Sequence, residues 1–596
     1  MRDTETVLGI IRDRGSRGLP LEDVYRQLYN PNLYLYAYGR IYRNAGATTP
    51  GTTPETVDGM SLAKIGRIIE DIRYERYRWT PVKRTYIPKK GGKVRPLGLP
   101  TWSDKLVQEV MRLILEAYYD VQFSDRSHGF RPKRGCHSAL TEVYHGWVGS
   151  KWLIEGDIRG CFDALDHTVL VSILAEKIHD NRFLGLIRAL LKAGYLEEWR
   201  YHDTLSGSPQ GGIVSPILAN IYLDKLDRFV EEVLCPAYNR GERRRINPPY
   251  LRLRSQRQRL KKRGHSEEAR ALFRQMQQLP SLDPADPDYR RLHYVRYADD
   301  TLLGFIGPKH EAEEIKRRLK EFLLQDLKLE LSEEKTLITH AASQAARFLG
   351  YEIAVLNDDV KRDRRGYRSI NGQIGLTVPH AVAQDACTRY LHHGKPVHRT
   401  ELLHNAAYDI VVQYQAEYRG LVQYYRMAYN LHRFNRLKWV MEQSLTKTLA
   451  HKGRVSVDTV YERYRATLQT EFGTSPGLRI VVERGEGKKP LVATWGGIPL
   501  RRQMTAILTD QPPATYAGRS ELVQRLLADH CELCGSRESV QVHHVRALKD
   551  LRKAGRPERP AWVRVMAARR RKTLVVCREC HAAIHAGRPT RRNSAE

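Results

Sequence analysis

The chain has 596 residues, which is enough for about four domains of ordinary size. Its 99 Lys and Arg residues exceed its 68 Asp and Glu residues and give a formal net charge of +31, which predicts a polyanionic partner, nucleic acid above all. No stretch approaches the roughly eighteen consecutive apolar residues of a membrane span, and the first residues lack the apolar core of a signal peptide. We therefore expect a cytoplasmic protein with no membrane contact.

Residues 1–80 have the pattern of helices, with a Gly/Thr/Pro-rich loop after Arg43. Tyrosines at helical spacing in this segment could stack on bases, but such side chains are more often part of a core. We expect them to be buried.

The next segment, residues 83–100, predicts two basic strands joined by a Gly-Gly turn. It carries Lys89, Lys90, Lys93 and Arg95. A solvated charged hairpin would explain these residues. A finger that clamps a triphosphate would explain them too, because Arg makes bidentate phosphate contacts and Lys supplies a point charge.

Three carboxylates follow apolar, strand-like segments. Asp157 lies near the end of the short strand predicted by "WLIEGDI", where a buried carboxylate needs a cation or hydrogen-bond partners. Asp299 and Asp300 separate the β-favouring runs "LHYVRY" and "TLLGFI", which predicts a hairpin with two acids at its tip. Adjacent acids are common in turns, but a third carboxylate nearby favours a cation between them.

The segments around these acids allow more than one functional interpretation. Phe162 could form one wall of a nucleotide pocket, and Gln210 lies in a Gly-rich loop that either precedes a core helix or approaches a base pair. Residues 237–291 are strongly basic and helical in composition, which indicates an inserted RNA-binding arm or a solvated face.

After the acidic hairpin, we expect an amphipathic helix, a strand that carries Lys335, and one further strand over residues 346–353. From about residue 400, apolar positions three and four residues apart predict a helical bundle. Residues 475–520 have the composition of a basic linker module.

The C-terminal segment carries two C-x-x-C pairs, Cys531 with Cys534 and Cys577 with Cys580. This spacing predicts a structural zinc site, whereas the four scattered cysteines are expected to be reduced packing residues. Four histidines lie between and after the pairs: His543, His544, His581 and His585. They could join the zinc ligands, or form a separate site from a His-His strand and two histidines one helical turn apart.

Seven blocks then identify a family. "YIPKKGGKVRPLGLPTWSDKLVQ", "SHGFRP", "EGDIRGCFDALDH", "GSPQGGIVSPILANIYLDKLD", "YVRYADD", "LSEEKTLITH" and "RFLGYEI" occur in the order seen in group II intron reverse transcriptases. The chain resembles the intron-encoded proteins of the mitochondrial-like type, and its histidine pattern resembles the HNH, or ββα-metal, nucleases.

This resemblance implies an α+β multidomain protein. Its parts would be a right-hand polymerase fold with fingers and an antiparallel palm sheet, a helical thumb or maturase domain, and a small ββα-metal HNH zinc domain. The expected bounds are 1–80 for an N-terminal extension of the fingers, 81–360 for fingers and palm with the arm at about 237–291, 361–474 for the thumb, 475–520 for a basic DNA-binding linker domain and 521–596 for the nuclease.

The resemblance also implies roles for single residues. Asp157, Asp299 and Asp300 would be the catalytic Mg²⁺ ligands of a two-metal polymerase centre. Lys89 and Arg95 would hold the triphosphate, with Lys335 as a further candidate, while Phe162 would exclude a ribose 2′-hydroxyl and Gln210 would lie beside the incoming nucleotide.

In the nuclease, His544 would be the general base, and His543, His581 and His585 would hold one divalent ion. The four cysteines, Cys531, Cys534, Cys577 and Cys580, would bind Zn²⁺. Lys572 occupies the asparagine position of the motif, so the group that orients the base is open. A zinc module that only grips DNA is the alternative.

The implied function combines an RNA-directed DNA polymerase, a maturase that binds intron RNA and promotes its splicing, and an endonuclease that nicks target DNA to prime reverse transcription. The partners would be intron RNA in a ribonucleoprotein, target DNA and dNTPs, with a homodimer left open. A non-mobile splicing maturase and a domesticated reverse transcriptase are the alternative functions.

Overall fold

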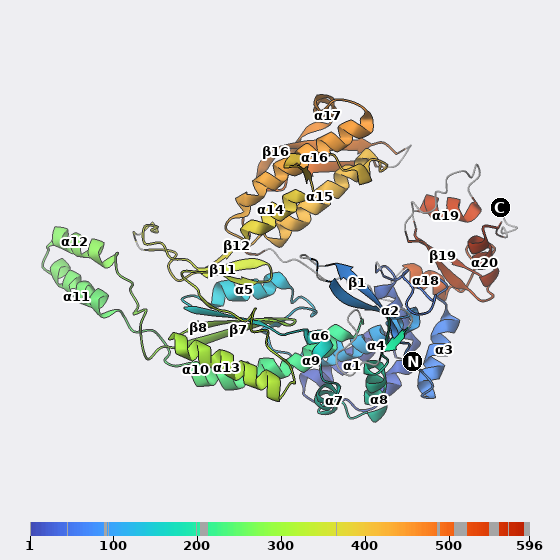
Figure 1. Cartoon of the computed structure of the whole chain (residues 1–596), viewed down its shortest axis with the longest axis horizontal. Helices are drawn as coiled ribbons and strands as arrows, with labels where there is room; N and C mark the ends of the chain where they lie inside the picture. The colour runs from blue at the N-terminus through green and yellow to red at the C-terminus, as the bar shows by residue number, and fades with distance from the viewer. Residues whose placement is uncertain are drawn as a thin grey trace.

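The computed structural model describes residues 2–590, apart from 45, 89–91, 93, 198–199, 203–211, 365, 367, 485–488, 506–520, 547–559, 570 and 589. In the described part of the chain, no helix is both long enough and apolar enough to cross a membrane. Figure 1 shows N-terminal helices beside a central sheet, a helical arm that extends from that sheet, a mainly helical body above it, and the C-terminal module against the N-terminal helices.

The N-terminal body is helical because four side chains cap the starts of its helices. Asp3, Asn30, Ser61 and Thr101 each accept a hydrogen bond from a backbone N–H of the first turn. The elements are α1 (Thr4–Ser16), η1 (Val24–Tyr29), α2 (Pro31–Ile41), α3 (Leu62–Arg73) and α4 (Trp102–Tyr119). The tyrosines at 34, 36 and 38 are buried in the core, as expected from the sequence.

The basic segment after α3 forms the expected antiparallel hairpin of β1 (Val82–Pro88) and β2 (Val94–Leu99). It belongs to a four-stranded sheet of order β2-β1-β5-β6, completed by β5 (Tyr195–Glu197) and β6 (Arg200–His202). Lys89, Lys90 and Lys93 lie outside the described residues.

The central sheet has five strands in the order β3-β7-β8-β4-β9. They are β3 (Ser127–His128), β7 (Arg291–Tyr297), β8 (Asp300–Ile306), β4 (Trp152–Asp157) and β9 (Ile338–His340). The strands are buried on both faces: Leu153 packs on the side of α5 (Cys136–Gly146), and its neighbour Ile154 packs on the side of α9 (Ser215–Arg228) and α13 (Lys309–Gln325). Figure 1 shows α5 above the sheet and α13 below it.

Further helices lie beside the sheet and the N-terminal body, and the last two of them lead into the basic arm. They are α6 (Cys161–Ala164), α7 (His167–Ala175), α8 (Asn181–Leu191), η3 (Phe229–Leu234) and α10 (Cys235–Tyr238). The arm is the helix pair α11 (Pro248–Lys262) and α12 (Ser266–Met276), and it projects far from the sheet in Figure 1. No residue of α11 is buried, so its arginines and lysines are available to a polyanion.

Two of our strand predictions need correction. Residues 346–353 form a hairpin of β10 (Ala346–Phe348) and β11 (Tyr351–Val355), because Leu349 and Gly350 adopt positive φ angles of 48° and 72° and reverse the chain. Lys335 lies in the turn before β9 and not in a strand.

The body above the sheet contains the expected helical bundle. It consists of β12 (Ile374–Thr377), α14 (His380–Thr388), β13 (Leu391–His392), β14 (Lys395–Pro396), η4 (Thr400–Leu402), α15 (Ala407–Tyr424), η5 (Leu431–Arg433), α16 (Phe434–Gly453) and α17 (Val457–Tyr464). The antiparallel sheet of β15 (Arg465–Thr470), β16 (Gly473–Val482) and β17 (Leu491–Gly496) packs on it through the buried side chains of Leu478 and Trp495. The boundary expected at residue 475 lies inside β16. The sequence did not indicate this, because a strand-turn-strand segment rich in Gly and Lys has the composition of a linker.

The C-terminal module contains α18 (Glu521–Leu527), β18 (Gln541–His544), α19 (Ala561–Arg569), β19 (Thr573–Val576) and α20 (Arg578–Ala586). The antiparallel pair of β18 and β19 with α20 gives the expected ββα arrangement. The side chains of Leu522, Val523 and Val542 belong to the same core as the N-terminal helices. The module is thus packed against that body, beside α2 and α3 in Figure 1.

Candidate active sites

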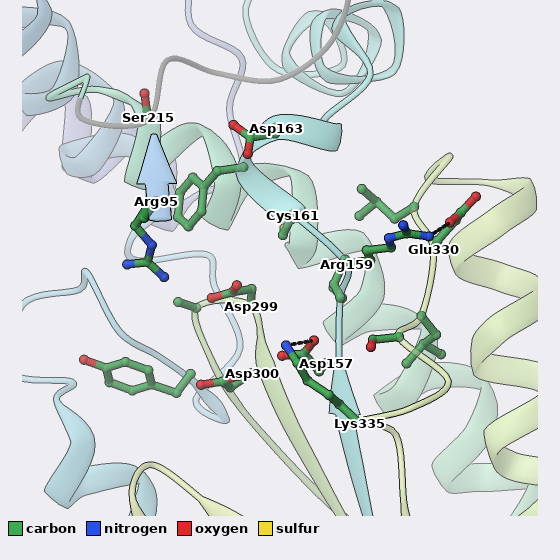
Figure 2. Close-up of a pocket in the computed structure, with 18 of the residues that line it drawn as sticks. Arg95, Asp157, Arg159, Cys161, Asp163, Ser215, Asp299, Asp300, Glu330 and Lys335 are labelled. Carbon is green, nitrogen blue, oxygen red and sulfur yellow. Dashed lines mark hydrogen bonds and ion pairs between the residues drawn. The ribbon is translucent and has the colours of Figure 1, made fainter. Parts of the chain in front are cut away.

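The three expected carboxylates lie at one end of the central sheet. Asp157, the last residue of β4, stands directly opposite Asp300, the first residue of β8. Asp299 precedes Asp300 in the turn after β7, and Figure 2 shows all three around one cavity. This cavity has a volume of about 1220 Å³, which is large enough for a nucleotide.

Backbone packing fixes the turn that holds Asp299 and Asp300. Ala298 adopts a positive φ of 53°, and its N–H donates to the carbonyl oxygen of His128 at 2.9 Å. Gly129 follows with φ of 83°, and a Cβ at that position would lie 2.9 Å from the Ala298 nitrogen. Glycine is therefore required for the "SHGF" segment to approach the turn this closely.

A buried arginine supports the same turn from below. Arg296 donates to both carboxylate oxygens of Asp227, to Asn220 Oδ1 at 3.1 Å and to the carbonyl oxygen of Ala298 at 2.8 Å. The sequence interpretation missed this residue. A charged residue inside the apolar run "LHYVRY" was the signal that could have revealed it.

The electrostatics of the site favour bound cations. Burial and the carboxylates of Asp299 and Asp157 raise the pKa of Asp300 to about 6, and burial also raises the pKa of Asp299. Lys335 Nζ lies 2.9 Å from Asp157 Oδ2 and partly neutralises the group. Carboxylate oxygens are the ligands that Mg²⁺ prefers, so the residues present fit such an ion.

Two of the four residues expected to bind the nucleotide lie in the described part of the chain. Arg95 and Phe162 line the same cavity as the carboxylates, and Figure 2 shows Arg95 opposite Asp299. The Phe162 ring packs edge-to-face with Phe130 at 6.3 Å between centroids. Lys89 and Gln210 lie outside the described residues.

The two C-x-x-C pairs meet in the C-terminal module. The sulfur atoms of Cys531, Cys534, Cys577 and Cys580 all lie within 4.8 Å of one another. The 3.7 Å between Cys534 Sγ and Cys577 Sγ matches the separation of about 3.8 Å that two thiolates have on a tetrahedral zinc. Backbone N–H groups point at two of the sulfurs, from Cys534 to Cys531 and from Cys580 to Cys577, each at 3.5 Å. The four thiols fit a zinc ion.

Three of the histidines form a second cluster, and the zinc thiols do not take part in it. His543 lies on β18, and His581 and His585 lie one turn apart on α20. The ligand atoms of these three side chains and of Asp58 all lie within 4.8 Å of one another. The sequence interpretation missed Asp58, because it lies in the loop between α2 and α3, almost five hundred residues away in the chain.

His544 points away from this cluster. Its Nδ1 lies 3.3 Å from the carbonyl oxygen of Val542, and its Nε2 lies 3.2 Å from the hydroxyl of Tyr38. Only a protonated Nδ1 can donate to a carbonyl, so these partners assign the lone pair to Nε2, which accepts from Tyr38. Burial lowers the pKa of His544 to about 4, which keeps the ring neutral at physiological pH.

The geometry also accounts for Lys572. This residue precedes β19, and its carbonyl oxygen accepts the N–H of Val545 at 2.9 Å. The ammonium group of Lys572 can only donate hydrogen bonds, so it cannot accept one from the imidazole N–H of His544. The carbonyl oxygen of Val542 instead holds Nδ1 of His544 and so orients the ring.

Three family models match this chain. Residues 87–243 match "Reverse transcriptase (RNA-dependent DNA polymerase)", residues 380–476 match "Type II intron maturase", and residues 531–581 match "AI2M/AI1M-like, HNH endonuclease". The "Group II intron-encoded protein LtrA" of Lactococcus lactis subsp. cremoris is 39% identical over 94% of both chains. The chain belongs to the group II intron-encoded proteins.

Further relatives match nearly the whole chain. The "Uncharacterized 91 kDa protein in cob intron" of Schizosaccharomyces pombe is 33% identical, over 96% of this chain and 72% of its own length. The "Putative COX1/OXI3 intron 1 protein" of Saccharomyces cerevisiae is 30% identical, over 93% of this chain and 68% of its own. This group II intron-encoded protein is thus a multifunctional enzyme with reverse transcriptase, maturase and HNH endonuclease domains.

Proposed function

We propose that this protein copies intron RNA into DNA at a break that its own nuclease makes in target DNA. The observation that carries the proposal is the presence of two separate centres in one chain: three carboxylates at the end of the central sheet and a histidine cluster in the C-terminal module. A nick leaves a 3′-hydroxyl, and a polymerase needs a 3′-hydroxyl to begin. The two activities therefore form consecutive steps.

In the polymerase centre, Asp157, Asp299 and Asp300 would hold Mg²⁺. When bound, such ions stabilise the attacking and leaving oxygens of an in-line displacement at phosphorus. Arg95, on the wall of the cavity, would bind the triphosphate of a dNTP through its guanidinium. Phe162, held edge-on by Phe130, would occupy the space of a ribose 2′-hydroxyl and so select dNTPs. We assign Lys89 to the triphosphate and Gln210 to the incoming nucleotide.

In the nuclease centre, Nε2 of His544 would accept a proton from the attacking water. The carbonyl oxygen of Val542 keeps the other proton on Nδ1, so the basic nitrogen is defined before DNA arrives. His543, His581 and His585 would hold one divalent ion beside the scissile phosphate, where it would stabilise negative charge on the phosphate oxygens. The four cysteines would hold a separate Zn²⁺ that supports the fold of the module.

The basic surface would hold the nucleic acids. The exposed arm of α11 and α12 and the helices α14–α17 would bind intron RNA to form a ribonucleoprotein. They would stabilise the folded RNA for splicing. We assign residues 81–360 to fingers and palm, extend the thumb from residue 361 through the β15–β17 sheet, and assign residues from 521 onward to the nuclease. The free cysteines at 136, 161 and 387 are buried, which suits a reducing cytoplasm.

The proposal is tested by separating the two centres in the purified ribonucleoprotein. Asp299→Ala should nick target DNA without extending it, whereas His544→Ala should extend a supplied primer without nicking. Loss of both activities in either variant, with the fold retained, would contradict two independent centres.

A further inference from the structure

The loop between α2 and α3 enters the nuclease centre through one carboxylate. Asp58 Oδ2 lies 2.8 Å from His585 Nε2, and Oδ1 lies 3.2 Å from His581 Nε2 and 3.4 Å from His543 Nδ1. Oδ1 also accepts the backbone N–H of His544 at 2.7 Å. Asp58 therefore contacts every histidine of the centre.

These contacts bring imidazole nitrogens and a carboxylate together. His581 Nδ1 lies 3.0 Å from Gln541 Oε1 and donates to it, which leaves Nε2 as the nitrogen that faces Asp58, 3.3 Å from His585 Nε2. The buried His543 ring forms no hydrogen bond from either nitrogen to any described residue. Three imidazoles and a carboxylate whose ligand atoms converge within 4.8 Å fit one divalent ion, which would satisfy all four side chains at once.

The loop is held against the module by more than Asp58. Gly59 N–H donates to the carbonyl oxygen of Val542 at 3.0 Å, and Val542 N–H donates to the carbonyl oxygen of Met60 at 2.8 Å. Gly59 has φ of 76°, which turns the chain so that Asp58 enters the centre. Met60 and Val542 are both fully buried in one core, so the seam is apolar as well as hydrogen-bonded.

In this arrangement two side chains of the N-terminal body occupy positions that nicking would use. Asp58 shares a cluster of ligand atoms within 4.8 Å with His543, His581 and His585, so a scissile phosphate that replaced its carboxylate would take over its place in that cluster. The water that His544 would activate needs its Nε2, and the Tyr38 hydroxyl already donates to that atom. Tyr38 itself is fully buried.

We propose that Asp58 is the fourth ligand of the HNH ion in a closed state, in which the ion ties the nuclease to the N-terminal helices, and that a phosphate of target DNA replaces Asp58 when nicking begins. The proposal rests on the assignment of the histidine cluster as a nuclease centre. It adds a metal ligand from outside the nuclease module and an off state for DNA cleavage.

The test compares Asp58→Asn with Asp71→Asn in the full chain. Asn keeps the oxygen that accepts the His544 N–H, whereas Asp71 is a half-exposed carboxylate on α3 whose side chain pairs with Arg76. Both changes are made in a protein with Asp299→Ala and Asp300→Ala, so that the polymerase centre does not compete for the ion. The zinc-loaded protein is titrated with Mn²⁺ and followed by electron paramagnetic resonance, and hydrogen exchange of residues 57–60 and 541–546 is measured with and without Mn²⁺.

We expect Asp58→Asn to weaken Mn²⁺ binding by about tenfold and to abolish the protection that Mn²⁺ gives to both segments, with Asp71→Asn unchanged. At saturating Mn²⁺, Asp58→Asn should nick target DNA at least as fast as the parent protein. Tyr38→Phe should also nick faster, without a change in Mn²⁺ affinity. Primer extension by Asp58→Asn with an intact polymerase centre checks that the fold is retained.

Equal Mn²⁺ affinity in Asp58→Asn and the parent would overturn the assignment of Asp58 as a ligand. Loss of nicking in Asp58→Asn at saturating Mn²⁺ would show that Asp58 works in the open enzyme and would overturn the closed state. If no variant and no parent protein nicks DNA, the nuclease assignment itself fails, and the Mn²⁺ comparison still decides the role of Asp58.

Discussion

Arg296 and Asp227 form a bidentate ion pair at 2.7 and 2.6 Å, and neither side chain has any exposure to solvent. Burial disfavours the charged guanidinium, but Asp227 outweighs this and raises the pKa of Arg296 above its usual range. The pair joins α9 to β7 immediately before the turn of Asp299 and Asp300. It ties the helix below the sheet to the position of the two carboxylates that we assign to the polymerase centre.

Removing one partner of this pair should be costly. Arg296→Met leaves the Asp227 carboxylate buried without its cationic partner. We therefore expect the free energy of unfolding to fall by about 3–5 kcal/mol and the Tm in calorimetry to fall by about 10 °C. The double variant Arg296→Met with Asp227→Asn should recover most of the Tm, because no buried charge remains. Its primer extension should stay low, since nothing holds the Ala298 carbonyl. Full activity in the double variant would contradict the positioning role.

The three carboxylates should be needed for synthesis and not for RNA binding. We expect Asp299→Ala to abolish cDNA synthesis in a primer-extension assay, because one ligand of the proposed Mg²⁺ ions is lost. Its affinity for intron RNA should stay within about twofold of the parent, since RNA is held by the distributed basic surface. Asp326→Ala, at an exposed position after α13, is the matched control. Normal extension by Asp299→Ala would contradict the assignment.

The pKa of Asp300, raised to about 6 by burial and by Asp299 and Asp157, predicts a pH-dependent stability. Folding favours the protonated carboxyl, so its contribution is complete below about pH 4 and is lost as the pH rises through 6. Asp300→Asn cannot ionise, so it should not lose this stability as the pH rises. Because the side chain keeps contact with solvent, we expect a gain of only about 1 kcal/mol, or about 2 °C in Tm, for the metal-free protein above pH 6.

Two further measurements check this pH dependence. Saturating Mg²⁺ should reverse the order of the two proteins at pH 8, because the carboxylate of Asp300 would bind the ion more strongly than the amide that replaces it in the variant. An equal Tm gain at pH 4 and pH 8 would show that the stabilisation has another cause.

The proposed zinc site should be separable from both proposed active centres. Cys577→Ser should lower the zinc content from about one ion per chain to none in elemental analysis, because a tetrahedral site needs all four thiolates. The variant should lose nicking, since the ββα fold depends on the ion, and should keep extension of a supplied primer. Cys235→Ser, at a cysteine outside the cluster, is the control. Unchanged zinc content in Cys577→Ser would contradict the four-thiolate site.

The central sheet and the cluster of four cysteines could be predicted because their signals are local. A strand that ends in Asp157, a hairpin that presents Asp299 and Asp300, and two C-x-x-C pairs each lie within a few residues of sequence. The hairpin at Leu349 and Gly350 was mistaken for one strand, because a two-residue turn with a leucine at positive φ leaves the apolar pattern almost unbroken.

The contacts between distant segments could not be predicted. Asp58 has no neighbour in sequence that indicates a metal site, and its position beside His543 depends on how the C-terminal module packs on α2 and α3. Arg296 and Asp227 form a pair only through the packing of α9 on the sheet. Tertiary packing decides such contacts, and no periodicity in the sequence reports them.

The most direct test of the account is whether cDNA is covalently joined to the nicked DNA strand. Purified ribonucleoprotein is incubated with end-labelled target DNA, with and without dNTPs, and the labelled strand is sized on a denaturing gel. We predict a nick without dNTPs and an extended, labelled strand with them. His544→Ala should give neither product but still extend a supplied primer, and His530→Ala, at an exposed position in the same module, should behave as the parent. Extended strands of normal yield from His544→Ala, or cDNA that is never joined to the labelled strand, would contradict the proposal that this nuclease primes this polymerase.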